Sequence, residues 1–143
     1  MGKLNFKHEN LCKALERLKE VIVVFDNFKS KTQDTYDVSL YRIFRDSMIQ
    51  RFEFCVDLYW KYIKYILEKN LIKDPEYLTP KLVIKAACNA RLITEEDAEV
   101  MLQMIDDRNR SSYIYKEEMA EQISSAIKKY FQVMKSYLEK FNS

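Results

Sequence analysis

The scarcity of glycine and proline is the feature of this sequence that most restricts its fold. One glycine (Gly2) and two prolines (Pro75 and Pro80) occur in 143 residues. Hairpin turns and strand ends depend on these residue types, so a chain nearly without them is poorly suited to form sheets. Hydrophobic residues make up 48% of the chain, which is enough to build one sizeable core. We therefore predict an all-α chain that folds as a single domain over residues 1–143.

Apolar residues recur at spacings of three and four in five segments, and this period predicts helices. The predicted helices cover residues 6–28, 37–71, 80–90, 95–108 and 116–141. We expect residues 73–75 to end the second helix, and Thr79 and Thr94 to cap the third and fourth. The short connections favour an antiparallel up-and-down bundle of four main helices and one short helix. Because the second helix carries two apolar stripes, the pattern leaves room for a dimer interface.

Charge and hydropathy exclude several classes of protein. Lys and Arg number 24 against 22 Asp and Glu, and a net charge of +2 does not by itself suggest nonspecific nucleic-acid or membrane binding. The longest apolar run, residues 21–25, is far too short to span a membrane, and the first residues do not resemble a signal peptide. Cys12, Cys55 and Cys88 are widely spaced among apolar neighbours, which is typical of reduced thiols. We therefore expect a cytoplasmic protein.

The residues that most often carry catalysis or bind metals are nearly absent. The single histidine, His8, lies near the N-terminus, where we expect it to be exposed to solvent. Without clustered cysteines or further histidines, a zinc site is almost excluded, and with Gly2 alone no glycine-rich phosphate loop can form. We therefore expect neither a metal site nor a cofactor. Arg51 lies among apolar positions, where a structural ion pair is favoured over catalysis.

One segment stands out chemically, at the expected end of the fourth helix. Residues 106–115 read Asp-Asp-Arg-Asn-Arg-Ser-Ser-Tyr-Ile-Tyr and bring two guanidinium groups, an amide, two hydroxyls and two phenols together. Such groups bind phosphate oxygens, and the candidate binding residues are Arg108, Asn109, Arg110, Ser112 and Tyr115. Arg108 and Tyr113 lie about 140° apart on a continuous helix, so they converge only if the helix ends between them. The alternative is that the acidic residues and arginines form surface ion pairs while the serines cap the last helix.

Several segments together resemble a known family. Residues 46–54 (Asp-Ser-Met-Ile-Gln-Arg-Phe-Glu-Phe) and 58–61 (Leu-Tyr-Trp-Lys) lie on the longest predicted helix, and Pro80 opens the short one. Lys-Ala-Ala-x-x-Ala-x-Leu-Ile follows at residues 85–93, and Asp-Arg-Asn at 107–109 precedes Tyr115 and Glu-Glu at 117–118. Over roughly residues 40–140, this order resembles the nucleotidyltransferase substrate binding proteins of the HEPN superfamily, which include the HepT-type toxins.

The resemblance implies a helical-bundle subunit that usually dimerises and works with a separately encoded minimal nucleotidyltransferase. In the toxin branch, the dimer joins two Arg-x4-His-x-Tyr motifs into a metal-independent ribonuclease site. Arg108 matches the arginine and Tyr115 the tyrosine, but Tyr113 occupies the position of the histidine. Since an unperturbed tyrosine has a pKa of about 10, against about 6.5 for histidine, it is a poor base at neutral pH. In the same branch the nucleotidyltransferase transfers AMP to the motif tyrosine, which here is Tyr115.

Three functions remain open. The first is a dimeric partner subunit of a minimal nucleotidyltransferase encoded nearby, which binds nucleotide or RNA phosphate near Arg108 to Tyr115 and is AMPylated on Tyr115. The second is an active endoribonuclease toxin in which Arg108 and Tyr113 are catalytic. The third is a non-enzymatic helical interaction module. The departure at Tyr113 favours binding or modification over cleavage.

Overall fold

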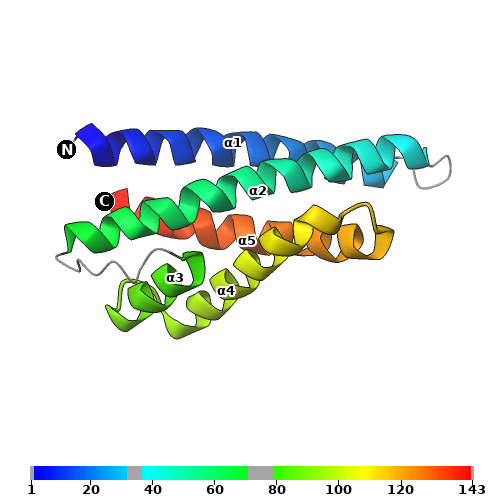
Figure 1. Cartoon of the computed structure of the whole chain (residues 1–143). Coiled ribbons are helices and arrows are strands. Elements are labelled where there is room, and N and C mark those ends of the chain that lie inside the picture. The colour runs from blue at the N-terminus through cyan, green and yellow to red at the C-terminus, as the bar shows by residue number, and fades with distance from the viewer. Residues whose placement is uncertain (1, 32–36, 71–78, 143) are drawn as a thin grey trace.

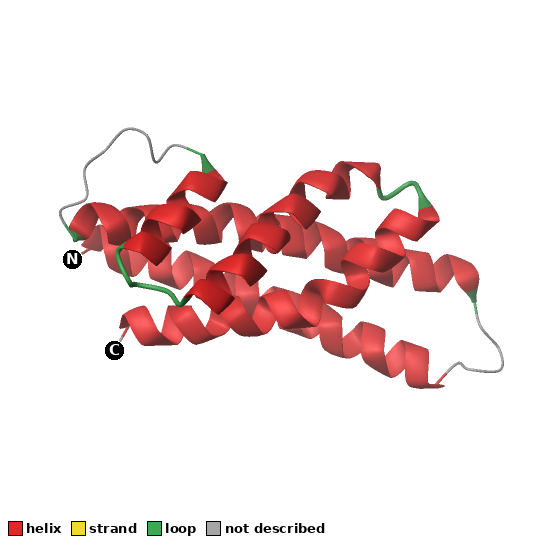
Figure 2. Cartoon of the chain, turned by 90° about the horizontal axis from the view of Figure 1, so that it is seen from below, coloured by secondary structure: helices red, strands yellow, loops and turns green. Residues whose placement is uncertain are grey.

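The computed structural model describes residues 2–31, 37–70 and 79–142 as a bundle of helices. The helices are α1 (Gly2–Lys31), α2 (Val38–Lys69), α3 (Pro80–Asn89), α4 (Glu95–Arg110) and α5 (Glu117–Asn142), with a 3₁₀ turn, η2 (Ser111–Tyr113), after α4. The four long helices alternate in direction, and α3 lies beside α4 at one end (Figure 1). These described residues contain no strand (Figure 2). The predicted all-α, up-and-down bundle of four main helices and one short helix is confirmed.

The helix starts follow local capping chemistry. The Asp37 carboxylate accepts hydrogen bonds from the backbone N–H groups of Ser39 and Leu40 at 3.0 and 3.1 Å, so Asp37 caps α2 and is not its first residue. Thr79 and Thr94 cap α3 and α4 as predicted, with Pro80 in the first turn of α3. The predicted stop of α2 at residues 73–75 lies outside the described residues. None of the described helices combines the length and apolarity needed to cross a membrane.

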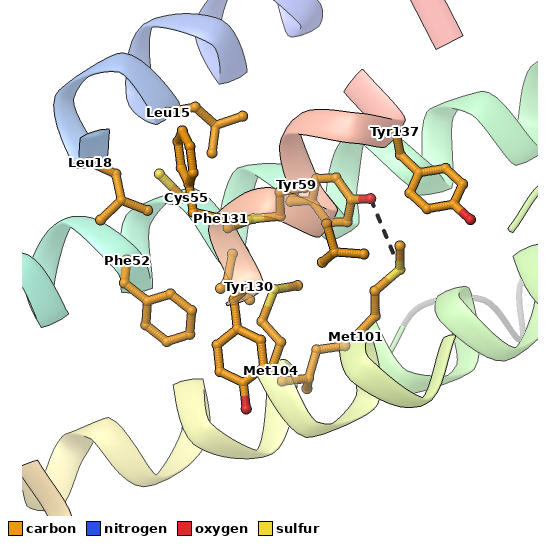
Figure 3. Close-up of a cluster of buried hydrophobic side chains, with 14 of the residues drawn as sticks. Leu15, Leu18, Phe52, Cys55, Tyr59, Met101, Met104, Tyr130, Phe131 and Tyr137 are labelled. Carbon is orange, nitrogen blue, oxygen red and sulfur yellow. Dashed lines mark hydrogen bonds between the residues drawn. The ribbon is translucent and has the colours of Figure 1, made fainter. Parts of the chain in front are cut away.

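The core is built where all four long helices meet (Figure 3). Phe52 of α2 stacks on Tyr130 of α5, with ring centroids 5.6 Å apart and an angle of 21° between the rings. Both apolar stripes of α2 contribute buried residues, namely Met48, Ile49, Phe52, Cys55, Val56, Tyr59, Tyr62, Ile63, Ile66 and Leu67. The second stripe therefore packs within the chain. It does not form the dimer interface that the two stripes made possible.

His8 differs from its predicted position. It is half-buried on α1, with Nδ1 3.4 Å from the Tyr62 hydroxyl and Nε2 3.4 Å from the Cys12 sulfur. The prediction of a solvent-exposed histidine was wrong because α1 begins at Gly2 and carries His8 against α2. All three cysteines are free, but only Cys55 is fully buried. Burial raises the pKa of Cys12 and raises that of Cys55 to about 12, so neither thiol is ionised at neutral pH.

Candidate functional site

Arg108, two residues before the end of α4, reaches across to α2. Its Nε and Nη2 atoms donate to the two carboxylate oxygens of Asp57 at 3.0 and 3.1 Å, and Nη1 donates to Glu53 at 2.9 Å. Glu53 and Asp57 lie one turn apart on α2, so both carboxylates face α4. The Arg108 side chain is 27% exposed, against 26% for Glu53 and 46% for Asp57. The ion pair with Glu53 joins residues 46–54 to residues 107–109, two of the segments that carry the family resemblance.

Ser111 completes this cluster from the 3₁₀ turn. Its hydroxyl lies 2.6 Å from Glu53 Oε2 and 2.5 Å from the carbonyl oxygen of Arg108. Since a hydroxyl has one proton, it donates to one of these oxygens at a time. The hydrogen bonds that Arg108 donates to Asp57, with the charges of Asp57 and Glu53, raise the pKa of Arg108. The guanidinium is therefore held charged between two carboxylates, and a phosphate must compete with them for it.

Asn109 and Arg110 point to another face of α4. They line a groove of about 630 Å³ between α4 and α5, together with Lys129. Arg110 pairs with Asp107, which is buried and also accepts a hydrogen bond of 2.5 Å from the Tyr130 hydroxyl. The hydrogen bond with Asp107 raises the pKa of Arg110. The two arginines of the predicted site thus lie on different faces of the bundle, each bound to its own carboxylates.

The alternative interpretation of this segment is right in one part and wrong in another. Asp107 pairs with Arg110, and Asp106 pairs with Lys81. However, Asp107 is a buried residue at 7% exposure and does not form a surface ion pair. Ser111 is buried too and contacts Arg108 and Glu53, so it does not cap the last helix.

The tyrosines of the segment lie on the surface between α4 and α5. Tyr113 is 50% exposed and Tyr115 75%, and their ring centroids are 6.4 Å apart; Ser112 is exposed beside them. The α-helix ends at Arg110, two residues later than predicted, and continues as the 3₁₀ turn. Within the described residues neither tyrosine is hydrogen-bonded to Arg108. The predicted site is therefore split within one chain into Arg108, the groove with Asn109 and Arg110, and the exposed tyrosines.

Arg45 is a charged residue that the sequence analysis missed. Its side chain is 1% exposed and donates to Glu117 at 2.8 and 3.2 Å, to Glu121 at 3.2 Å and to Asp46 at 3.0 Å. Burial opposes its charge, but these carboxylates outweigh that effect and raise the pKa of Arg45, while its hydrogen bond lowers the pKa of Glu117. The cluster ties the start of α2 to the start of α5, next to the tyrosines. One signal was available: Arg45 lies four residues before Ile49, on the second apolar stripe.

Arg51 takes the structural role that was predicted. Its Nη1 donates to the carbonyl oxygen of Arg17 at 2.7 Å and lies 3.7 Å from Glu20. Over residues 2–31, 37–70 and 79–142, no group of three or more His, Cys, Asp or Glu side chains is placed to hold a metal ion. The charged clusters described above are therefore built from ion pairs and hydrogen bonds.

Comparisons with known proteins bear on the family and the fold. A family model described as "nucleotidyltransferase substrate binding protein like" matches residues 6–143. A Thermus thermophilus crystal structure is 29% identical with a TM-score of 0.73, and the match covers 93% of this chain and 99% of that one. A Haemophilus influenzae protein, whose structure is described as revealing the fold of a substrate binding domain of a nucleotidyltransferase, is 22% identical with a TM-score of 0.80, covering 95% and 99%. That second likeness shows a shared fold. No curated protein matches the chain.

Proposed function

This chain belongs to the family of nucleotidyltransferase substrate binding proteins, and we propose that it is the substrate-binding subunit of a two-component system. The other component is a minimal nucleotidyltransferase encoded nearby. The match over residues 6–143 carries the proposal, because it extends over almost the whole chain and the family is named for this partnership. The solved neighbour described as a nucleotidyltransferase substrate binding domain has the same helical fold and supports it. We place the proposed site at the cluster of Arg108, Glu53 and Asp57, because this ion pair joins two segments of the family resemblance.

A phosphate group of a nucleotide or RNA binds near Arg108 by replacing one of its carboxylates. Asp57 is the one displaced, because its side chain is 46% exposed and can turn into solvent. Glu53 is 26% exposed and lies within hydrogen-bond distance of Ser111 as well, so it keeps its place. The freed edge of the guanidinium, Nε and Nη2, has the fork geometry that suits two phosphate oxygens. Ser112 and Tyr115, exposed on the segment after α4, provide further donors, whereas Asn109 and Arg110 face the groove between α4 and α5.

Tyr115 is the acceptor of AMP in this proposal. Its side chain is 75% exposed, so a second protein has access to it. The phenolic oxygen attacks the α-phosphorus of ATP, an O–P bond forms, and the bond between the α- and β-phosphates breaks to release pyrophosphate. The phenolic proton passes to a base of the nucleotidyltransferase. The attached phosphate then adds negative charge to the exposed segment between α4 and α5, where it repels other phosphates.

The endoribonuclease alternative gains no support from the described residues. Cleavage needs a base within hydrogen-bond reach of the attacking hydroxyl and a cation near the phosphate. In the described part of the chain, no hydrogen bond joins Tyr113 to Arg108, and the Tyr113 side chain is 50% exposed at the surface. Binding or modification therefore remains the proposal.

We propose a homodimer formed at the end of the bundle that carries these tyrosines. The ion pair of Arg42 with Glu117, at 2.8 Å, brings the first turns of α2 beside the start of α5. Ile43, which follows Arg42 on α2, is 61% exposed, and the rings of Tyr113 and Tyr115 are exposed just before α5 begins. Apolar side chains exposed in one region are typical of a protein interface, and tyrosine is enriched at such surfaces.

Co-purification with the nucleotidyltransferase encoded nearby tests the partnership, and light scattering after gel filtration tests the dimer. We expect the wild-type chain to elute as a dimer and to bind the partner, and Ile43→Glu to elute as a monomer. Phe6→Glu is the matched control, because Phe6 is 63% exposed near the start of α1. The start of α1 lies at the end of the bundle opposite to the connection between α4 and α5 (Figure 1). A wild-type monomer would contradict the dimer, and a chain that ignores the partner would contradict the whole proposal.

A further inference from the structure

A second groove, between α1 and α2, has an unusual distribution of charge. Its volume is about 580 Å³, which is in the usual range for small-molecule sites. Lys13 and Arg17 of α1 and Arg51 of α2 line it, and no carboxylate does. The groove between α4 and α5 is similar in size, but Asp106 and Asp107 balance its two cations. Of these two grooves, the one between α1 and α2 therefore has the lining that suits an anion.

The cations of this groove differ in how firmly they are held. The bond from Arg51 to the Arg17 carbonyl oxygen fixes the Arg51 guanidinium across the two helices. Glu20 is its only carboxylate neighbour within the described residues, at 3.7 Å, and is 72% exposed. In the same part of the chain Lys13 and Arg17 form no ion pair. Lys13 and Arg17, which are exposed and not ion-paired in these residues, are thus available to phosphate oxygens, as is the positioned guanidinium of Arg51.

The rest of the lining suits an aromatic ring. Phe54 of α2 is 61% exposed at the groove, although exposing its benzyl side chain to water costs free energy. Ala14 and Leu58 provide apolar surface beside it, and the amides of Asn10 and Gln50 add donors and acceptors. An exposed aromatic ring next to cations is the combination that binds a base and its phosphate, because every base has a face that stacks.

We propose that the groove between α1 and α2 binds a nucleotide. The base stacks on Phe54 while its phosphates bind Lys13, Arg17 and Arg51. This site is separate from the cluster around Arg108: Phe54 follows Glu53 directly, but the two side chains lie about 100° apart around α2 and face different neighbours. The inference goes beyond the proposed function, since it requires neither the partner protein nor Tyr115.

Calorimetry on the full chain tests both halves of the site, with ATP, inorganic triphosphate and adenosine as separate ligands. We expect ATP to bind more tightly than either fragment. Arg17→Ala should lower the affinity for ATP about tenfold, because one charge-assisted contact is lost, and should lower the affinity for triphosphate as well. Phe54→Ala should lower ATP affinity by a similar factor and leave triphosphate unchanged. Lys19→Ala is the matched control, because Lys19 is exposed on α1 outside this groove. All three side chains are exposed, so these variants should fold.

Photolabelling with an azido-adenine analogue of ATP locates the base. Trypsin releases Phe54 within residues 52–61 and Tyr113 and Tyr115 within residues 111–116. We expect the label on residues 52–61 and its loss in Phe54→Ala. Label on residues 111–116 alone, or ATP affinity unchanged in both groove variants, would overturn this inference and leave the proposed function standing. Absence of any ATP binding would also overturn it.

Discussion

The ion pair of Arg108 with Glu53 should contribute measurably to the free energy of unfolding. Its burial and its distance give the expected magnitude. Both side chains are about three-quarters buried, and Nη1 and Oε2 are 2.9 Å apart. A hydrogen bond to a charged group contributes roughly 1.5–3 kcal/mol, and the remaining exposure places this pair near the lower limit, at about 1.5 kcal/mol. Asp57 makes two hydrogen bonds to Arg108 but is 46% exposed, which limits its coupling to about 1 kcal/mol.

Double-mutant cycles measure these couplings, with Arg108→Ala combined first with Glu53→Ala and then with Asp57→Ala. Urea unfolding followed by circular dichroism gives the free energy of unfolding of each variant. The exposed pair of Arg51 and Glu20, at 3.7 Å, is the control and should couple by less than about 0.5 kcal/mol. The reasoning is refuted if Glu53 couples to Arg108 no more strongly than Glu20 does to Arg51.

Three further predictions concern the core. Tyr130→Phe removes the 2.5 Å hydrogen bond to the buried Asp107 carboxylate and should cost about 1–2 kcal/mol in urea unfolding. Ile127→Ala, at a fully buried position, should cost about 2–4 kcal/mol in the same assay, and a smaller loss would argue against tight packing there. Burial raises the pKa of Tyr62, and that of Cys55, to about 12, so both favour the protonated form in the folded state. The unfolded-state pKa is about 10 for Tyr62 and about 8.5 for Cys55. The contribution of each group to stability is complete below its unfolded-state pKa and is lost as the pH rises towards 12. The free energy of unfolding should therefore fall between pH 8 and pH 12.

The helices could be predicted from the sequence because their information is local. Apolar residues three and four apart mark the buried face of each helix, and Thr79 and Thr94 cap through their own side chains. The end of α4 was placed two residues early, since weak helix formers there continue as a 3₁₀ turn held by Ser111. His8 was misplaced because helix length at a chain end depends on packing against α2.

The partners of the candidate site could not be predicted, because they are distant in sequence. Glu53 and Asp57 are more than 50 residues from Arg108 in the sequence, and only the packing of α2 against α4 brings them together. For the same reason, the sequence pattern grouped Arg108 with Arg110. Residues two positions apart on a helix point to different faces. The resemblance identified the two segments that meet, without showing the contact between them.

Transfer of AMP to Tyr115 is the most direct test of the central claim, that this chain works with a nucleotidyltransferase through the end of α4. The chain is incubated with the nucleotidyltransferase encoded nearby and ATP, digested with trypsin and analysed by mass spectrometry. We predict that residues 111–116 gain the mass of one AMP moiety in the wild type and in Tyr113→Phe, but not in Tyr115→Phe. An unmodified peptide, or an adduct that survives in Tyr115→Phe, would contradict the account.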